Sequence, residues 1–126
     1  MIQPVSDSEL ELLKIIWSNG GSALYIHIME ELSKTGRTWQ KNTVITLLSR
    51  LIKKGLVKTK KIGRRNEYIA IVSEENYQAA QTQALLNKLY EGNAKGLVST
   101  LIQKDMLSAG DLEELKTFWE SGVKKP

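Results

Sequence analysis

The chain of 126 residues contains no cysteine. This absence excludes disulfide frameworks, cysteine nucleophiles and thiolate metal sites, and it fits a reducing cytoplasm. Also missing is any apolar run of about 18 residues, the length that a membrane-spanning helix needs. Residues 1–8 lack the apolar stretch of a signal peptide. We therefore expect a cytoplasmic protein that is not inserted into a membrane.

Residue patterns typical of catalysis are missing as well. The one histidine, His27, lies between Ile26 and Ile28, where a lone histidine is more often a surface or partly packed residue than a ligand. No Gly-rich phosphate loop, nucleophile elbow or histidine–carboxylate cluster is present. The acidic pairs at 30–31 and 113–114 are adjacent in sequence, and adjacent residues on a helix do not face each other. We expect a protein that is not an enzyme and that binds neither a cofactor nor a metal.

Acidic residues are absent from one long segment of the chain. Residues 32–66 hold eleven Lys and Arg and no Asp or Glu, whereas residues 1–31 hold five acids and one Lys. A protein surface that serves only to keep the protein in solution carries charges of both signs. A segment of one sign makes a field that attracts a polyanion. The net charge is only +4, but its distribution favours nucleic acid as the partner.

The apolar spacing of the N-terminal part predicts three helices. Ser6 and Glu9 form the S-x-x-E pattern of a capping box and begin a helix over about residues 7–18. Ser22 is expected to cap a second, short helix that ends near Gly36. The third helix carries a buried stripe at helical spacing, made of Val44, Leu47, Leu48 and Leu51.

Two β-rich runs follow these helices. Residues 56–62 and 67–72 are separated by residues 63–66, which predicts a hairpin with a four-residue loop. Three helices and then a hairpin are the order of elements in a winged helix-turn-helix. The predicted fold is mainly α with a small β-hairpin. Residues 1–72 form the winged helix-turn-helix DNA-binding domain, and residues 73–126 form a helical dimerisation domain.

The third helix and the hairpin carry the candidate DNA-binding residues. A helix that enters the major groove, which is about 12 Å wide, needs one apolar side and one polar side. Amides pair with adenine, the Thr methyl group contacts the thymine methyl group, and cations reach guanine or phosphate. The outward set of the third helix offers these groups: Gln40, Lys41, Asn42, Thr43, Thr46 and Arg50. Cations at the helix end and along the hairpin are expected to contact phosphates, which orient the protein without reading sequence: Lys53, Lys54, Lys58, Lys60, Lys61, Arg64 and Arg65.

The C-terminal part is predicted to form three helices rich in apolar residues. Such a tail is too short to bury these side chains well by itself. Two arrangements cover them: a dimer, which we favour because it also doubles the phosphate contacts, or a tail folded back on its own N-terminal domain. The expected dimerisation residues are Leu85, Leu89, Leu97, Val98, Leu101, Leu112 and Leu115.

These residues together resemble the penicillinase-repressor (BlaI/MecI/CopY-type) family. The resemblance extends from about Val5 to Leu115. It implies a transcriptional repressor that binds a palindromic operator in double-stranded DNA as a homodimer and controls β-lactam resistance genes. The motifs that carry it in the N-terminal part are Ser6–Glu11, Trp17, Trp39, Thr43–Leu51, Lys53-Lys54-Gly55, Gly63-Arg64 and Tyr68. Looser matches to the C-terminal part of the family are Leu85-Leu86, Tyr90, Gly92, Leu97-Val98 and Leu107-Ser108.

The family pattern also bears on the inducing signal. Copper-responsive members sense metal through C-terminal cysteine clusters, and this chain has no cysteine. Members of the antibiotic-resistance branch are inactivated by cleavage of an Asn-Phe bond, and Thr100-Leu101 stands at that place here. The resemblance thus implies a membrane sensor protease as a partner and Thr100-Leu101 as the cleavage site.

A winged-helix module that binds protein or RNA is the alternative to a DNA-binding repressor, because fold alone does not decide function. A protein-binding version would expose apolar residues on the third helix, where this chain has amides, hydroxyls and cations. The deep, narrow major groove of A-form RNA does not admit such a helix. Both observations favour DNA.

Overall fold

The capping box at the start of the first helix forms as predicted. The Ser6 hydroxyl accepts a hydrogen bond from the Glu9 amide at 3.1 Å, and the Glu9 carboxylate accepts one from the Ser6 amide at 2.9 Å. In the computed structural model, which describes residues 2–122, α1 spans Asp7–Ser18, the predicted bounds. Met1 and residues 123–126, the outer ends of the two predicted domains, lie outside the described residues.

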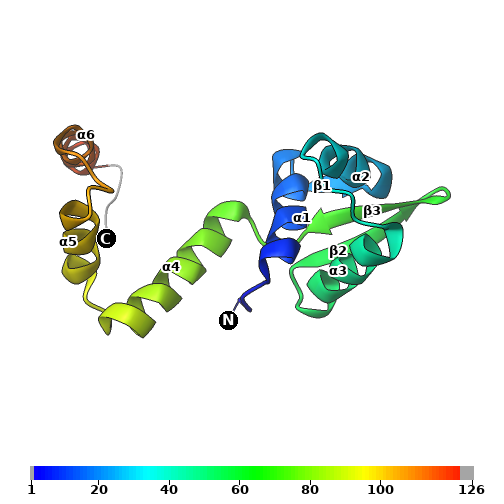
Figure 1. Ribbon diagram of the computed structural model, residues 1–126, viewed down its shortest axis with the longest axis horizontal. Helices are drawn as coiled ribbons and strands as arrows, with labels where there is room; N and C mark the ends of the chain where they lie inside the picture. The colour runs from blue at the N-terminus through cyan, green and yellow to red at the C-terminus, as the bar shows by residue number, and fades with distance from the viewer. Residues whose placement is uncertain (1, 123–126) are drawn as a thin grey trace. The chain divides into compact units, whose positions relative to one another are not determined.

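The described residues form six helices and one three-stranded sheet (Figure 1). They fall into two compact units, the first ending at Gln81 and the second beginning at Thr82. The prediction of a mainly helical fold with a β-hairpin is confirmed. After α1 the elements are β1 (Ser22–Leu24), α2 (Tyr25–Lys34), α3 (Lys41–Lys53), β2 (Val57–Ile62), β3 (Arg65–Ala70), α4 (Glu74–Tyr90), α5 (Ala94–Gln103) and α6 (Ala109–Glu120).

The hydrophobic core of the first unit lies between the helices and one face of the sheet. Helix α1 packs against α2, α3 and the sheet (Figure 1). The stripe predicted for the third helix is buried at all four positions. Apolar residues at helical spacing on each helix therefore meet in one core, as their pattern predicts. The fully buried residues include Leu12, Leu13, Ile16, Ile28, Val44, Leu48 and Leu51.

The sheet contains a strand that the sequence pattern did not predict. Strand β1 pairs antiparallel with β3, and the strand order is β1-β3-β2. Ser22 pairs with Ile69 in this strand and caps no helix, so the second helix was predicted to begin two residues too early. The true N-cap of α2 is Leu24, whose side chain makes no capping hydrogen bond.

The hairpin loop is shorter than the predicted four residues. Ile62 pairs with Arg65, which leaves a two-residue loop of Gly63 and Arg64. Gly63 has φ +63°, and Arg64 is not among the residues with positive φ. Positive φ at the first central residue alone is the pattern of a type II′ turn, which favours glycine there and suits the twist of the strands.

The end of α3 fixes where the hairpin begins. The Gly55 amide donates to the Ile52 carbonyl at 3.0 Å, and the Leu56 amide donates to the Leu51 carbonyl at 3.0 Å. These are the two hydrogen bonds of a Schellman motif, which places Gly55 in the left-handed region at φ +78°. Gly55 thus ends α3, and the buried Leu56 leads directly into β2.

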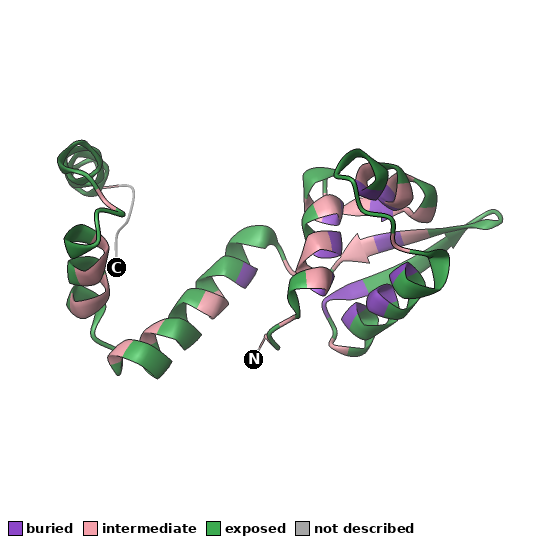
Figure 2. Cartoon of the chain, viewed as in Figure 1, coloured by how far each residue is buried: buried purple, intermediate pink, exposed green. Residues whose placement is uncertain are grey.

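Helices α5 and α6 are well capped but bury no side chain. Asn93 and Ser108 accept hydrogen bonds from the first-turn amides of α5 and α6. No residue of either helix is buried, and in α4 only Tyr77 is (Figure 2). Tyr77 belongs to the first unit, because it contacts α1. Local hydrogen bonds therefore define the helices of the second unit, while their apolar faces stay open.

Candidate DNA interface

The outward face of α3 presents polar side chains in one row. Asn42, Thr46, Ser49 and Lys53 are spaced by four, three and four residues, so they share one face of the helix. All four are exposed and lie opposite the buried stripe. An amide, two hydroxyls and an ammonium can donate and accept hydrogen bonds along a groove edge.

The six residues predicted for the recognition helix are all exposed. Lys41, Asn42, Thr43, Thr46 and Arg50 lie on α3, and Gln40 is its N-cap residue. A shallow groove beside the helix is lined by Asn42, Thr43, Thr46, Leu47 and Arg50, which brings four of the predicted residues together. The contact of these residues with bases stays a prediction.

Three exposed residues of α3 were not among those predicted, Ile45, Ser49 and Ile52, and the first two lie on or beside the outward row. Ser49 lies on the outward row, and Ile45 is exposed beside it. Both follow from the helical spacing that identified Thr46, but neither side chain makes the bidentate base pairing that singles out an amide or a guanidinium. Ile45 offers an apolar surface of the kind that contacts a thymine methyl group.

The predicted phosphate-binding lysines of the hairpin divide between the two faces of the sheet. Cross-strand partners share a face, and successive residues alternate. Lys61, paired with Asn66, is on the same face as the buried Tyr68. Lys58 and Lys60 are on the opposite face, where Lys60 pairs with Glu67. The hairpin thus presents cations on both sides, with Arg64 in the turn.

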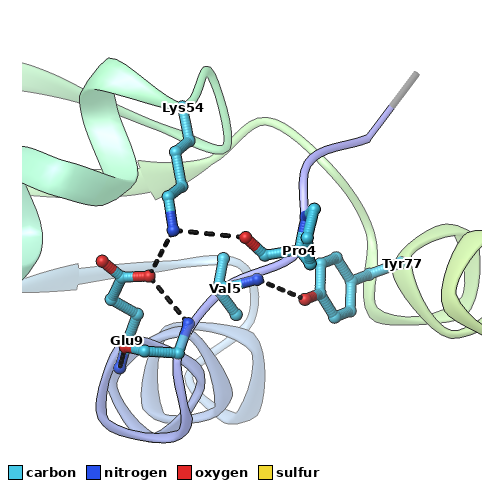
Figure 3. Close-up of polar contacts among 6 residues, drawn as sticks. Pro4, Val5, Glu9, Lys54 and Tyr77 are labelled. Carbon is cyan, nitrogen blue, oxygen red and sulfur yellow. Dashed lines mark hydrogen bonds and ion pairs between the residues drawn. The ribbon is translucent and has the colours of Figure 1, made fainter.

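Lys54 has a different role from the one predicted for it. Its ammonium donates to the Glu9 carboxylate at 2.7 Å and to the Pro4 carbonyl at 3.2 Å (Figure 3). These two contacts use the charge of Lys54 within the fold. We therefore remove Lys54 from the phosphate-binding set and assign it to holding the end of α3 against the start of α1.

The Glu9 carboxylate is the buried partner of this ion pair. The residue is 2 % exposed. Burial alone would raise the pKa of Glu9, but hydrogen bonds from Lys54 and Ser6 and the charge of Lys54 hold the pKa below its ordinary value. Glu9 is therefore ionised at neutral pH, and one side chain serves both the capping box and the ion pair.

A second set of contacts joins the start of α4 to α1 and to the segment that precedes it. The Val5 amide donates to the Tyr77 hydroxyl at 3.1 Å, beside the Lys54–Pro4 contact (Figure 3). Trp17 donates through Nε1 to the Val72 carbonyl at 2.9 Å, and its ring centroid lies 5.7 Å from that of Tyr77. These contacts anchor the first turns of α4 to the N-terminal unit.

Most cations of the acid-free segment are unpaired. Within residues 2–122, only three of the eleven make ion pairs: Lys34 with Glu31, Arg37 with Glu11, and Lys54 with Glu9. Arg37 also lies over the ring of Trp39, 5.0 Å from its centroid, in the turn that leads to α3. The other eight cations lie on α3 and the hairpin, where Glu67, the cross-strand neighbour of Lys60, is the one acidic residue, so most of this positive charge is not neutralised.

The residues predicted for dimerisation lie on open helix faces. Leu85, Leu89, Val98, Leu112 and Leu115 are exposed, and Leu97 and Leu101 are half-buried. The predicted cleavage residues, Thr100 and Leu101, lie within α5 and are both half-buried.

Residues 2–122 hold neither a membrane-spanning helix nor a metal cluster. No helix in this range combines the length and apolarity that crossing a membrane requires. Within the same range, His, Asp and Glu residues nowhere gather in a group of three able to hold a metal ion.

Three helices, a hairpin and an unneutralised basic surface define a winged-helix DNA-binding protein. Residues 5–121 match the family model described as penicillinase repressor. The chain belongs to the penicillinase repressor family, as its motifs indicate. This is a family of DNA-binding transcriptional repressors and not of enzymes, which confirms the prediction that the chain is no enzyme.

Individual relatives are similar over most of the chain. The penicillinase repressor of Bacillus licheniformis is 37 % identical over 94 % of this chain and 91 % of its own length. The methicillin resistance regulatory protein MecI of Mammaliicoccus sciuri is 32 % identical over 90 % of this chain and 91 % of its own length. A solution structure of monomeric Bacillus licheniformis BlaI with the blaP half-operator is 40 % identical, with a TM-score of 0.52, over 61 % of this chain and 92 % of that one.

Proposed function

We propose that this chain binds a palindromic DNA operator as a homodimer and represses the adjoining genes. The observation that carries the proposal is the polar outward face of α3 beside eight cations that make no ion pair within residues 2–122. A relative at 40 % identity binds a half-operator as a monomer, which supports one winged-helix unit for each half-site.

The two parts of this surface have different tasks. The outward residues of α3 lie in the major groove, where Asn42, Thr46 and Arg50 contact base edges and supply specificity. Cations of the hairpin and of the end of α3 contact phosphates and supply affinity and register. The phosphate set is Lys53, Lys58, Lys60, Lys61, Arg64 and Arg65.

The dimer is proposed from the second unit, Thr82 onward. No described residue from Thr82 to Gly122 is buried, and the large apolar side chains include Leu89 at 63 % exposed and Trp119 at 66 %. A contiguous apolar surface on a monomer marks an interaction site. A second copy of the same helices covers these faces and holds two winged-helix units on one operator. The proposed contact residues are Leu85, Leu89, Leu97, Val98, Leu101, Leu112 and Leu115.

Footprinting of the DNA upstream of the chain's own gene tests this proposal. Hydroxyl radicals should leave two protected half-sites related by a two-fold axis and separated by about one helical turn or a multiple of it. Protection of a single half-site at saturating protein would argue against a dimeric operator complex. Uniform protection along the fragment would argue against sequence specificity.

We propose control of β-lactam resistance genes as the biological setting, because the similar proteins are penicillinase and methicillin resistance repressors. Release would follow cleavage at Thr100-Leu101 by a membrane sensor protease. The bond lies inside α5, where the Thr100 hydroxyl donates to the Gly96 carbonyl at 3.1 Å. Proteases cleave opened, extended chain, so cleavage there requires α5 to unfold locally.

Exposure of cells to a β-lactam, followed by immunoblotting of the repressor, tests the release step. A shortened chain that appears as the target genes are induced supports cleavage. An intact chain alongside full induction contradicts it and leaves the DNA-binding proposal untouched.

A further inference from the structure

A groove in the first unit lies between the start of α2, the first turns of α3 and the hairpin tip. Its lining includes Tyr25, Lys41, Arg64, Arg65 and Tyr68. No acidic residue lines it. Within residues 2–122 its three cations make no ion pair. The groove therefore has the charge of an anion site.

Two helices begin at this groove without a side-chain cap. Neither Leu24, the N-cap of α2, nor Gln40, the N-cap of α3, makes a capping hydrogen bond with its side chain. The starts of α1, α5 and α6, by contrast, are capped by Ser6, Asn93 and Ser108. An uncapped start leaves amide donors without partners and carries partial positive charge, which together favour an anion.

Tyr68 gives a second and independent sign of a ligand. Its side chain is packed into the core, with only 5 % of the residue exposed, yet its hydroxyl makes no hydrogen bond to any residue in 2–122. The oxygen is not sealed from solvent, since no fully buried unpaired polar atom is found in this range. Tyr68 lines the groove, so its hydroxyl can donate a hydrogen bond to a ligand there. Burial and the nearby Tyr25 raise the pKa of Tyr68, so the hydroxyl keeps its proton at neutral pH.

We propose that this groove is the seat of one DNA backbone phosphate in each half-site. The Tyr68 hydroxyl and the free amides at the helix starts donate hydrogen bonds to the phosphate oxygens, and Lys41 and Arg64 balance its charge. This inference rests on the proposed function, which places α3 and the hairpin on the DNA. A phosphodiester bound between these two elements fixes the angle at which α3 enters the major groove.

A phosphate bound in this groove predicts different effects for the loss of a neutral hydrogen-bond donor and for the loss of a charged one. Tyr68→Phe removes one hydrogen bond to an anion and no charge. Affinity for operator and for scrambled DNA should fall alike by about 3- to 10-fold, while the dependence of affinity on salt stays as in the parent. Lys41→Met removes a charge, so the salt dependence becomes shallower by about one unit.

A methylphosphonate scan of the operator tests the seat directly. Replacing one phosphate at a time by a neutral methylphosphonate identifies the positions where the parent chain loses affinity. We expect one position in each half-site where that loss is clearly smaller for Tyr68→Phe than for the parent. Tyr90→Phe, which removes a phenol hydroxyl outside the groove, is the matched control and should keep the parent profile.

Three outcomes decide whether the groove holds a phosphate. Weakened binding by Tyr68→Phe with an unchanged melting temperature supports the seat, because the hydroxyl has no partner within the described residues. Parent affinity and a parent methylphosphonate profile for Tyr68→Phe overturn it while the proposed function stands. Absence of DNA binding by the parent chain, seen before any variant is made, refutes the proposed function and the seat together.

Discussion

The Lys54 ammonium lies 2.7 Å from the Glu9 carboxylate, so the C-cap residue of α3 is joined to the first turn of α1. Glu9 is 2 % exposed and also accepts the hydrogen bond that closes the capping box. The pair thus connects the end of α3 to a helix that packs against both α2 and the sheet. We infer that it holds α3 in its position relative to the hairpin.

Glu9→Gln should lower the free energy of unfolding. Glutamine keeps the hydrogen bond of the capping box, so the substitution removes mainly the charge that faces Lys54. Loss of a partner for a partly buried charge costs about 1–3 kcal/mol at pH 7. Urea denaturation followed by circular dichroism measures this difference. Glu11→Gln, which weakens the exposed pair with Arg37, is the matched control and should change stability much less.

The effect of Glu9→Gln should depend on pH. Because the pKa of Glu9 is lowered in the folded chain, its ionised form contributes stability above the ordinary pKa of a glutamate, about 4.5. That contribution is lost as the pH falls through the lower folded pKa. The difference in the free energy of unfolding between parent and variant should be constant from about pH 6 to 8 and shrink below about pH 4. An equal difference at about pH 3 and about pH 7 would show that the carboxylate charge is not what stabilises this corner.

Thr46→Ala should reduce discrimination between operator and scrambled DNA more than it reduces affinity for scrambled DNA. Thr46 lies on the outward row of α3, where a lost base contact costs about 1–3 kcal/mol of discrimination. Competition titrations with both DNA fragments measure the ratio, and Thr82→Ala on α4 is the matched control. A proportional loss on both fragments would identify Thr46 as a residue that positions the helix.

The double substitution Arg64→Ala with Arg65→Ala should weaken binding to all DNA sequences alike. Phosphate contacts release counterions, so the slope of log affinity against log salt should become shallower by about one to two units. Lys88→Ala on α4 removes one cation outside the hairpin and is the control. A parent slope for the double variant would contradict a role for the hairpin tip in binding phosphate.

Leu89→Asp should convert the proposed dimer into a folded monomer. Leu89 is 63 % exposed at the end of α4, so a carboxylate there is tolerated in one chain but is desolvated at an interface of two. Sedimentation should give the mass of one chain, circular dichroism should give parent helicity, and operator affinity should fall. A dimer of Leu89→Asp would exclude this residue from the interface.

Local signals predicted the elements that depend on neighbouring residues. The capping box at Ser6 and Glu9 gave the start of α1, and helical spacing gave the buried stripe of α3. Strand β1 was missed because three residues carry little pattern, and their pairing partner, β3, follows more than 40 residues later. The hairpin loop was overestimated because several residues near Gly63 favour turns, and cross-strand pairing decides among them.

The candidate site likewise divides into residues that local patterns predict and residues that meet only in the folded chain. Helical spacing was enough to predict the exposed residues of α3, since outward positions follow from the buried stripe. The role of Lys54 was not accessible to this reasoning, because its partner Glu9 lies 45 residues earlier and meets it only in the folded unit. The Tyr68 groove likewise joins three elements that are separate in sequence.

Fluorescence anisotropy with labelled DNA tests the central claim most directly. The chain is titrated onto the DNA upstream of its own gene and onto a scrambled fragment, at several salt concentrations. We predict binding of two chains per operator that weakens steeply with salt and prefers the native fragment by about 10³-fold or more. Weak and equal binding to both fragments at every salt concentration would contradict a sequence-specific, dimeric repressor.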